Sequence, residues 1–344
     1  MGHKYARVVA NRANSLDRDA ESRRARTGRV LAAVVALTVV LGACGEDGES
    51  GEGGSSPGAA DPAPLRSAPR GAASVTAALC RPLAVGRLGQ VEDPAAQELS
   101  GLVASRTQPG VLWAHNDSGD TPRLLALGRN GRLLGSFDVT GAQALDWEDL
   151  AARGGDLYVG DIGDNARQRP EVVVYLVSEP DASSGGATLP ATVVRLRYPD
   201  GPHDAEALLV DPRRGDLVVV TKELDGVAGV YAARPPLSGG GAITLRRVAR
   251  IDLGIGSAVT AGDVSPEGSV VALRSYDRLF VWSRRRGEPI TRTLRRPPCS
   301  PPTELREPQG EALALERGGR AALTVTEGPA PLIRRYMPRP RTDG

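Results

Sequence analysis

Short apolar runs, each opened by a polar residue, recur along the chain from residue 100 onward. Their leading residues are Ser100, Glu148, Glu206, Thr260 and Glu311. Successive leading positions are 48 to 58 residues apart. Each run is followed by two further strand-length runs rich in β-branched residues, with turn residues such as Asn130-Gly131 between runs. A repeat of roughly 40–50 residues built from short strands is typical of a β-propeller.

The number of strands in each repeat predicts how the ring closes. The first four repeats hold a fourth strand-like run, at 133–139, 192–198, 243–251 and 290–294. The fifth repeat ends after its third run, and residues 82–88 at the start of the domain can supply the missing strand. Such a pairing removes open sheet edges. We therefore predict an all-β propeller over residues 75–338, with five blades of four antiparallel strands and a tail at 339–344. A sixth blade is the alternative, if 181–191 or 299–309 contain strands.

The path of the chain within a blade brings two sets of polar residues to one face. The innermost strand runs first and the second returns antiparallel, so the start of strand one lies beside the end of strand two. The sequence predicts a polar mouth of the central channel there. Its expected ligand-binding residues are Ser100, His115, Asn116, Asp117, Glu148, Asp161, Glu206, Lys222, Thr260, Arg274 and Glu311.

The N-terminal region has the pattern of an export signal. Four arginines between residues 23 and 29 precede an apolar run over residues 30–43, which is shorter than the roughly 20 residues of a spanning helix. The run ends Leu41-Gly42-Ala43-Cys44, which resembles the bacterial lipobox. That resemblance implies a signal peptide over 1–43, cleavage before Cys44, and acylation of Cys44. We expect an exported protein, anchored by lipid to the outer face of the cell membrane.

The region after the leader changes the charge of the mature chain. Residues 44–74 are rich in Gly, Ser and Pro and have little to bury, so we expect a disordered tether. The first 43 residues hold eight Lys and Arg against three Asp and Glu. The mature chain therefore carries a net charge of about −3, against +2 for the whole sequence. We expect no nucleic-acid partner, and a monomer.

Two cysteines remain after Cys44. Cys80 opens the folded region and Cys299 precedes the last repeat, and ring closure brings these segments near each other. An exported chain can oxidise them, so we predict a Cys80–Cys299 disulfide. Two unpaired buried thiols are the alternative.

Several sequence motifs resemble those of known propellers. The most distinctive motifs are Trp113–Gly119, Asp146–Ala151 and Gly160–Asn165. The pattern over residues 82–338 resembles exported bacterial propeller proteins and, more distantly, the phytase-like propeller group. The distant resemblance implies calcium that bridges acidic side chains to a phosphate and activates a water. It assigns no catalytic residue, and the sequence leaves the catalytic residues unknown.

Carboxylates that share a mouth of low dielectric repel one another, so their pKa values rise or cations compensate them. Compensation is expected from Lys222, Arg274 or a divalent metal. The candidate metal ligands are Glu148, Glu206, Glu311 and Asp161. Hard oxygen ligands make calcium the candidate cofactor. Only His115 and His203 follow the leader, and no cysteine lies near the mouth, which disfavours zinc. Alternatively, the glutamates accept backbone hydrogen bonds and lock one blade to the next.

Three functions remain open from the sequence. The first is an anchored propeller that binds a ligand or a protein partner at the acidic mouth. The second is a calcium-dependent hydrolase of phosphate esters, in which His115 beside Asp117 could serve as a general base rather than as a turn residue. The third is an envelope scaffold that uses the outer faces of the blades.

Overall fold

The computed structural model describes residues 76–340, apart from 95, 187–188 and 238–239. The chain divides into two units, 1–68 and 69–344, and every described residue lies in the second. The expected leader, the expected acylation site Cys44 and the tether therefore lie outside the described residues. Within the described ranges, no helix has both the length and the apolar character needed to cross a membrane.

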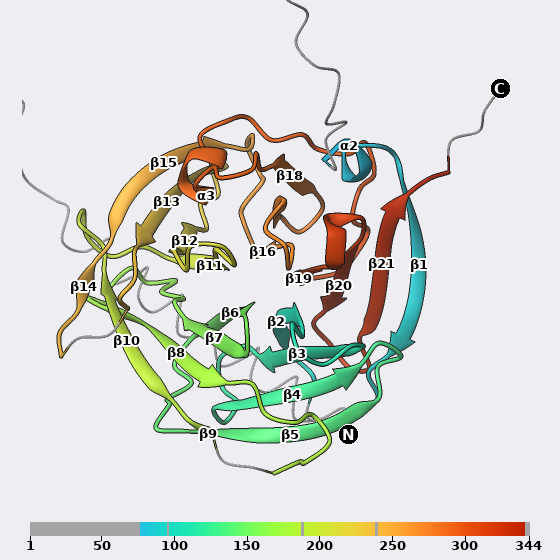
Figure 1. Cartoon of the computed structure of the whole chain (residues 1–344), viewed down its shortest axis with the longest axis horizontal. Helices are drawn as coiled ribbons and strands as arrows, with labels where there is room; N and C mark the ends of the chain where they lie inside the picture. The colour runs from blue at the N-terminus through green and yellow to red at the C-terminus, as the bar shows by residue number, and fades with distance from the viewer. Residues whose placement is uncertain (1–75, 95, 187–188, 238–239, 341–344) are drawn as a thin grey trace, which may run out of the picture. The chain divides into compact units, whose positions relative to one another are not determined.

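The described strands form five sheets, which are arranged as blades around a common centre (Figure 1). Blade 1 contains β2 (Leu99–Ala104), β3 (Val111–Asn116), β4 (Arg123–Gly128) and β5 (Leu133–Thr140). Blade 2 contains β6 (Trp147–Arg153), β7 (Asp156–Asp161), β8 (Val172–Ser178) and β10 (Thr192–Arg197). Blade 3 contains β11 (Ala205–Val210), β12 (Leu217–Thr221), β13 (Val227–Ala233) and β15 (Arg246–Asp252). Blade 4 contains β16 (Ala261–Val264), β17 (Val270–Arg274) and β18 (Leu279–Ser283). Blade 5 contains β19 (Gly310–Leu315), β20 (Ala322–Thr326), β21 (Leu332–Pro338) and β1 (Leu83–Gln90).

The first strands of the five blades form the inner ring. Each of β2, β6, β11, β16 and β19 contacts the first strands of both neighbouring blades. These strands begin at or next to the five leading residues of the sequence repeat. The prediction of a five-bladed, all-β propeller is therefore confirmed.

Ring closure also follows the prediction. Strand β1 pairs antiparallel with β21, from Leu83 opposite Pro338 to Gln90 opposite Leu332. The N-terminal strand thus completes the last blade and covers the edge that β21 would otherwise expose. In Figure 1, β1 and β21 lie side by side at the right-hand rim.

The two stretches that raised the alternative of a sixth blade do not form one. Residues 181–191 contain β9 (Leu189–Pro190), which pairs with β5 of blade 1. Residues 299–309 contribute only a bridge between Cys299 and Val281 within the described chain. A similar short strand, β14 (Ile243–Thr244), pairs with β10 of blade 2. Short outer strands therefore join neighbouring blades at the rim.

The prediction of a fourth strand at 290–294 is wrong. Ile290–Thr293 forms the short helix α3, which Pro289 precedes in an extended conformation. Ile290 and Leu294 are four residues apart, a spacing that places both on one side of a helix as readily as on one face of a strand. Both are buried against blades 3 and 4.

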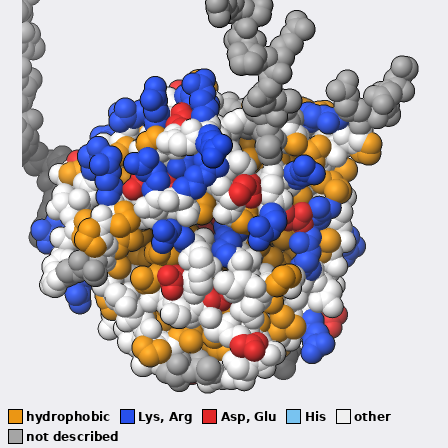
Figure 2. Space-filling view, viewed as in Figure 1, with side chains coloured by type: hydrophobic (Ala, Val, Ile, Leu, Met, Phe, Trp, Pro, Cys, Tyr) orange, Lys and Arg blue, Asp and Glu red, His pale blue; other side chains and the backbone are white. Residues whose placement is uncertain are grey.

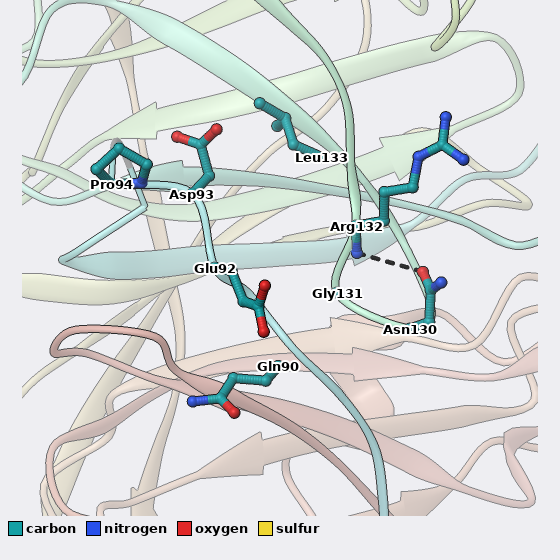
Figure 3. Close-up of a pocket in the computed structure, with 8 residues that line it drawn as sticks. All are labelled: Gln90, Glu92, Asp93, Pro94, Asn130, Gly131, Arg132 and Leu133. Atoms are coloured by element: carbon teal, nitrogen blue, oxygen red, sulfur yellow. Dashed lines mark hydrogen bonds between the residues drawn. The ribbon is translucent and has the colours of Figure 1, made fainter.

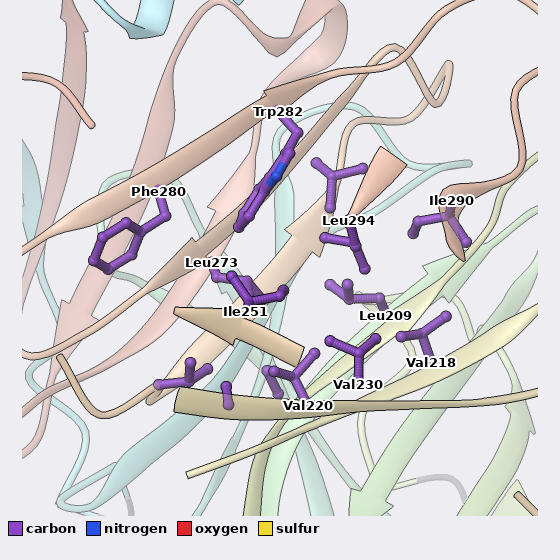
Figure 4. Packing of buried hydrophobic residues seen from close by; sticks show 14 of the residues in the cluster. Leu209, Val218, Val220, Val230, Ile251, Leu273, Phe280, Trp282, Ile290 and Leu294 are labelled. Atoms are coloured by element: carbon purple, nitrogen blue, oxygen red, sulfur yellow. The ribbon is translucent and has the colours of Figure 1, made fainter. Parts of the chain in front are cut away.

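The core consists of apolar side chains packed between neighbouring blades. The cluster between blades 3 and 4 joins Val220 and Val230 to Leu273 and Trp282, and α3 adds Ile290 (Figure 4). Because both faces of each blade are covered, the inner strands are apolar at nearly every position. Each fully buried large side chain of this kind stabilises the fold by roughly 1.5–3 kcal/mol.

The predicted disulfide is confirmed. Cys80 and Cys299 are bonded, with their Cα atoms 5.7 Å apart and a separation of 219 positions in sequence. Cys80 directly follows the short helix α2 (Thr76–Leu79), which packs against β18 and β21. The disulfide, the closing strand and all five hydrophobic clusters lie within residues 79–336. The unit 69–344 therefore contains a complete core of its own.

Candidate functional site

A β-bulge repeats at the entrance to the inner ring. The pairing of strands one and two skips one residue in blades 1, 2, 3 and 5. The skipped residues are Ser100, Glu148, Glu206 and Glu311. A bulge re-aims the side chain of the extra residue and is common beside functional sites. The repeated bulge is thus the local feature that turns the leading residues of four blades away from the regular ladder.

Two groups of carboxylates lie at this mouth and share Asp117. The first group consists of Asp117, Glu311 and Glu327, and the second of Asp117, Asp146 and Glu148. Within each group, one carboxylate oxygen from each residue lies within 4.8 Å of those from the other two. Strand two of blade 1 ends just before Asp117. Blade 1 therefore links the acids of blades 2 and 5 across the mouth. We call these five residues the acidic mouth.

Lys222 brings a positive charge to the mouth. It is the only lysine of the described chain, and its ammonium contacts the carboxylate of Glu206. The ammonium also lies 5.5 Å from the centre of the Tyr276 ring. The Tyr276 hydroxyl in turn donates a hydrogen bond of 3.1 Å to Glu311. One oxygen of Glu206, Oε2, is buried and has no hydrogen-bond partner among the described residues.

Burial, together with repulsion between neighbouring carboxylates, raises the pKa values of several acids at the mouth. Burial, with repulsion from Glu206 and Asp117, raises the pKa of Glu148 well above its usual value. Burial raises the pKa of Glu206 to about 8, although the Lys222 ammonium lowers it. Burial and then a hydrogen bond to Glu311 raise the pKa of Glu327 to about 8. The pKa of Asp146 rises to about 6, mainly through burial and repulsion from Asp117.

A different set of residues locks the blades together. Asp149, next to Glu148, is fully buried and accepts backbone hydrogen bonds from Leu208 and Gly262, at 2.8 and 3.1 Å. It thereby joins blade 2 to blades 3 and 4. Asp263 of blade 4 likewise accepts the Leu315 N–H of blade 5 at 2.7 Å. The blade-to-blade lock considered for the glutamates is thus present on neighbouring aspartates.

Two of the predicted ligand-binding residues also link blades. The Ser100 hydroxyl donates to the Glu148 carbonyl at 2.6 Å, and the Thr260 hydroxyl donates to the Gly310 carbonyl at 3.0 Å. Each bond connects the first strand of one blade to that of the next. Their side chains fix the positions of the strands that carry Glu148 and Glu311.

A glycine makes room for the second acidic group. A Cβ atom at Gly163 would lie 2.2 Å from Glu148 Oε1 and 2.5 Å from an oxygen of Asp146. Because any side chain at this position would displace both carboxylates, Gly163 allows them to approach the loop after β7.

His115 is buried within blade 1. Its Nδ1 atom lies 2.9 Å from the Asn116 carbonyl oxygen. Its ring packs edge-on against Trp147, with 5.4 Å between the ring centroids. Burial lowers the pKa of His115, which favours the neutral imidazole. Asn116 donates to Asp120 at 2.6 Å and holds the loop that carries Asp117. His115 and Asn116 therefore support the residues of the mouth through buried contacts.

Asp161 and Arg274 are engaged in buried ion pairs. Asp161 contacts Arg169 at 2.8 Å. Arg274 contacts Glu307 at 3.0 Å with neither side chain exposed, and also donates to the Ala312 carbonyl at 3.0 Å. The expected metal ligands are therefore not brought together as one set. Glu148 and Glu311 lie in separate groups around Asp117, while Glu206 and Asp161 each have a basic partner.

The ligand-binding residues expected from the sequence omitted Asp146 and Tyr276, which contribute to the mouth. The end of strand two in blade 5 predicts Glu327 at the mouth, and Asp146 lies two residues before Glu148, so the strand pattern contained a signal for both. Tyr276 lies in the β17–β18 turn. No repeat marks it, and only the fold reveals its contact with Glu311.

A separate pocket of about 480 Å³ lies where blades 5 and 1 meet (Figure 3). It lies between Gln90 at the end of β1 and the β4–β5 turn at 130–132, and Glu92 and Asp93 border it. The Asn130 side chain accepts a hydrogen bond from the Arg132 N–H at 3.2 Å, which shapes that turn. None of the predicted site residues lines this pocket.

Comparison with known proteins yields only distant structural likeness. No family model matches the chain, and no curated protein matches its sequence. Myxococcus xanthus glutaminyl cyclase is similar at 13% identity and a TM-score of 0.45, over 76% of this chain and 99% of that one. A gluconolactonase from Xanthomonas campestris is similar at 14% identity and a TM-score of 0.42, over 79% and 99%. A chain of a mitotic checkpoint complex is similar at 15% identity and a TM-score of 0.35, over 70% of this chain and 63% of that one.

Proposed function

We propose that this protein is an exported propeller, anchored to the outer face of the membrane through acylated Cys44. We further propose that its acidic mouth binds a positively charged ligand, with calcium as the first candidate. The export signal and the lipobox-like tetrapeptide support the location. The buried carboxylates of the mouth support the ligand class.

The observation that carries the proposal is the position of Asp117 between two carboxylate groups. Five acids from three blades gather there, while the nearby ammonium of Lys222 is already in contact with Glu206. Buried like charges at this separation repel one another unless protons or a cation intervene. A cation at Asp117 would relieve this repulsion in both groups at once.

Calcium suits the chemistry of these residues. It prefers oxygen ligands, tolerates irregular geometry, and commonly takes several carboxylates together with carbonyl groups and water. Asp117, Glu311 and Glu327 would hold it in one group, and Asp117, Asp146 and Glu148 in the other. A Lys or Arg side chain of a protein partner would also neutralise the negative charge of the mouth.

A phosphate-ester hydrolase is less well supported. Such an enzyme needs cationic side chains for the phosphate, and the two expected at the mouth, as well as Arg167, are engaged. Lys222 contacts Glu206, Arg274 pairs with Glu307, and Arg167 pairs with Glu223 at 2.7 Å. The acidic mouth therefore favours binding of a cation over binding of an anionic ester.

Thermal unfolding of the unit 69–344 with EDTA, and then with calcium or magnesium, tests the proposal. A ligand at about 100 times its Kd stabilises the folded state by about 2.7 kcal/mol. For a domain of this size that corresponds to a rise in Tm of roughly 5 °C or more. Asp117→Asn should abolish the rise, because both groups lose their shared member. Glu304→Gln, at an exposed position, should keep it. The same Tm with and without metal would rule out a calcium or magnesium site.

A further inference from the structure

A second charged region lies away from the mouth, between blade 3 and α3. A groove of about 640 Å³ is bordered by six arginines and one glutamate. The arginines are Arg234, Arg246, Arg285, Arg292, Arg295 and Arg296. We call this region the arginine groove. Figure 2 shows Lys and Arg side chains gathered over the part of the molecule where Figure 1 places α3 and β15.

Within the described chain, most of the charges of this groove are not compensated. Its one carboxylate, Glu288, is nearly buried and pairs with Arg296 at 3.0 Å. Arg295 donates only to the carbonyl of Val248, at 2.9 Å, which leaves its charge intact. Among the described residues, the guanidinium groups of Arg234, Arg246, Arg285 and Arg292 have no ion pair or side-chain hydrogen bond. All four side chains are exposed.

The path of the strands places much of the groove on the face opposite the mouth. Third strands of blades begin at the mouth and end on the opposite face. Arg234 follows the end of β13, and Arg285 follows the end of β18, which are both third strands. Strand β15 runs antiparallel to β13, so Arg246 at its start lies on the same face as Arg234.

The chain enters the propeller on this same face. Strand β1 begins at Leu83 opposite Pro338, the last residue of the third strand β21. Cys80 precedes β1 and is bonded to Cys299, which lies three residues after Arg296. The disulfide therefore joins the start of the described chain to a segment that borders the arginine groove.

We propose that the arginine groove docks the propeller onto the anionic headgroups of the membrane to which the tether leads. Guanidinium groups bind phosphate oxygens in pairs and remain charged at every physiological pH. An anionic leaflet attracts exposed basic residues, each strengthening binding about fivefold. Docking through this face turns the acidic mouth away from the membrane and toward the medium. The inference rests on the proposed membrane location, but not on a ligand at the mouth.

Sedimentation with lipid vesicles tests this inference on the unlipidated unit 69–344 with its disulfide intact. We expect binding to vesicles that contain phosphatidylglycerol, little binding to pure phosphatidylcholine, and release as salt rises from about 0.1 M to about 1 M. The variant R234Q/R246Q/R285Q/R292Q should bind at least about a hundredfold more weakly. The control R195Q/R197Q/R278Q/R306Q removes equal charge elsewhere and should change binding less than about fivefold. Circular dichroism and Tm establish that both variants are folded.

Three outcomes would overturn the docking proposal. They are absence of binding to phosphatidylglycerol, an equal loss in the two variants, and displacement by millimolar inorganic phosphate at constant ionic strength. The last would identify a site for free phosphate instead of a membrane surface. Incorporation of labelled palmitate, lost in Cys44→Ser, tests the anchor separately. A labelled protein that fails to bind vesicles would reject the docking face and leave the proposed location intact.

Discussion

Two adjacent carboxylates, Glu148 and Asp149, have different roles although they follow each other in the strand. Glu148 lies in a bulge and joins the acids of the mouth, whereas Asp149 accepts N–H groups from three blades. Neighbouring strand residues point to opposite sides, and the bulge adds to this difference. A residue's type therefore did not determine its role here; its place relative to the bulge did.

The structural role of Asp149 predicts a large loss of stability on Asp149→Asn. The amide group of asparagine would face backbone N–H groups that now donate to a carboxylate oxygen. A buried donor left without a partner costs about 1–3 kcal/mol, so we expect unfolding in urea to show a loss of about 2 kcal/mol. The exposed Asp138→Asn should change stability by less than about 0.5 kcal/mol. Equal stabilities of the two variants would contradict the lock.

The raised pKa of Glu327 predicts how stability depends on pH. The folded state holds this proton up to about pH 8, whereas the unfolded chain releases it near its ordinary value. Between these values the folded state binds more protons, so the free energy of unfolding falls as pH rises. Glu327→Gln should match the parent near pH 5. Near pH 9 it should be more stable by about 1 kcal/mol or less, since the group is partly exposed.

Urea titrations of parent and Glu327→Gln across this pH range would test that linkage. Glu316→Gln serves as a control of opposite sign, because hydrogen bonds to Arg335 and Arg129 outweigh burial and lower the pKa of Glu316. It should lower stability above about pH 5. Identical pH profiles for parent and Glu327→Gln would show that the mouth carboxyls do not share protons.

At the scale of elements, the disulfide is a covalent link between the segment before the closing strand β1 and the segment between blades 4 and 5. It closes a loop of 219 residues and attaches α2 to the segment after α3. Such a link restricts the unfolded chain and stabilises by about 2–4 kcal/mol. We expect Cys299→Ser to lower the free energy of unfolding by this amount at every pH, as measured in urea. A reducing agent should have the same effect on the parent and none on Cys299→Ser. Equal stability of the oxidised and reduced parent would contradict this role.

The sequence predicted the inner strands well because each is apolar, short and led by a polar residue. Closure by residues 82–88 followed from counting strands, since the fifth repeat lacked one. The apolar residues of 290–294 are four apart and fit a strand or a helix, so their pattern alone does not distinguish the two. The bulges were invisible in the sequence, since they arise from pairing with the second strand.

The site was predicted only as a region. The antiparallel return of strand two placed Asp117 beside Glu148 and Glu311 correctly, because this depends on topology alone. Arg274 and Asp161 were expected to reach the mouth, but each forms an ion pair, with Glu307 and Arg169 respectively. Side-chain pairing across blades depends on the loops, and the loops do not follow the sequence repeat. Tyr276 was missed for the same reason.

At the scale of the whole domain, charge is divided between two faces. The acidic mouth lies where first strands begin, and the arginine groove lies largely where third strands end. The expected net charge near −3 therefore conceals two regions of opposite sign. A tether that joins the propeller beside these arginines would orient the acidic mouth toward the medium, where it is accessible to ligands.

The proposed function requires that the acidic mouth binds a cation. Calorimetric titration of the unit 69–344 with calcium, at about pH 6 and about pH 8.5, tests it most directly. We predict saturable binding that strengthens at the higher pH, because protons on Glu327 and Asp146 compete with the metal. Binding should disappear in Asp117→Asn and persist in Glu304→Gln. Absence of binding at both pH values, or binding unchanged in Asp117→Asn, would contradict the claim.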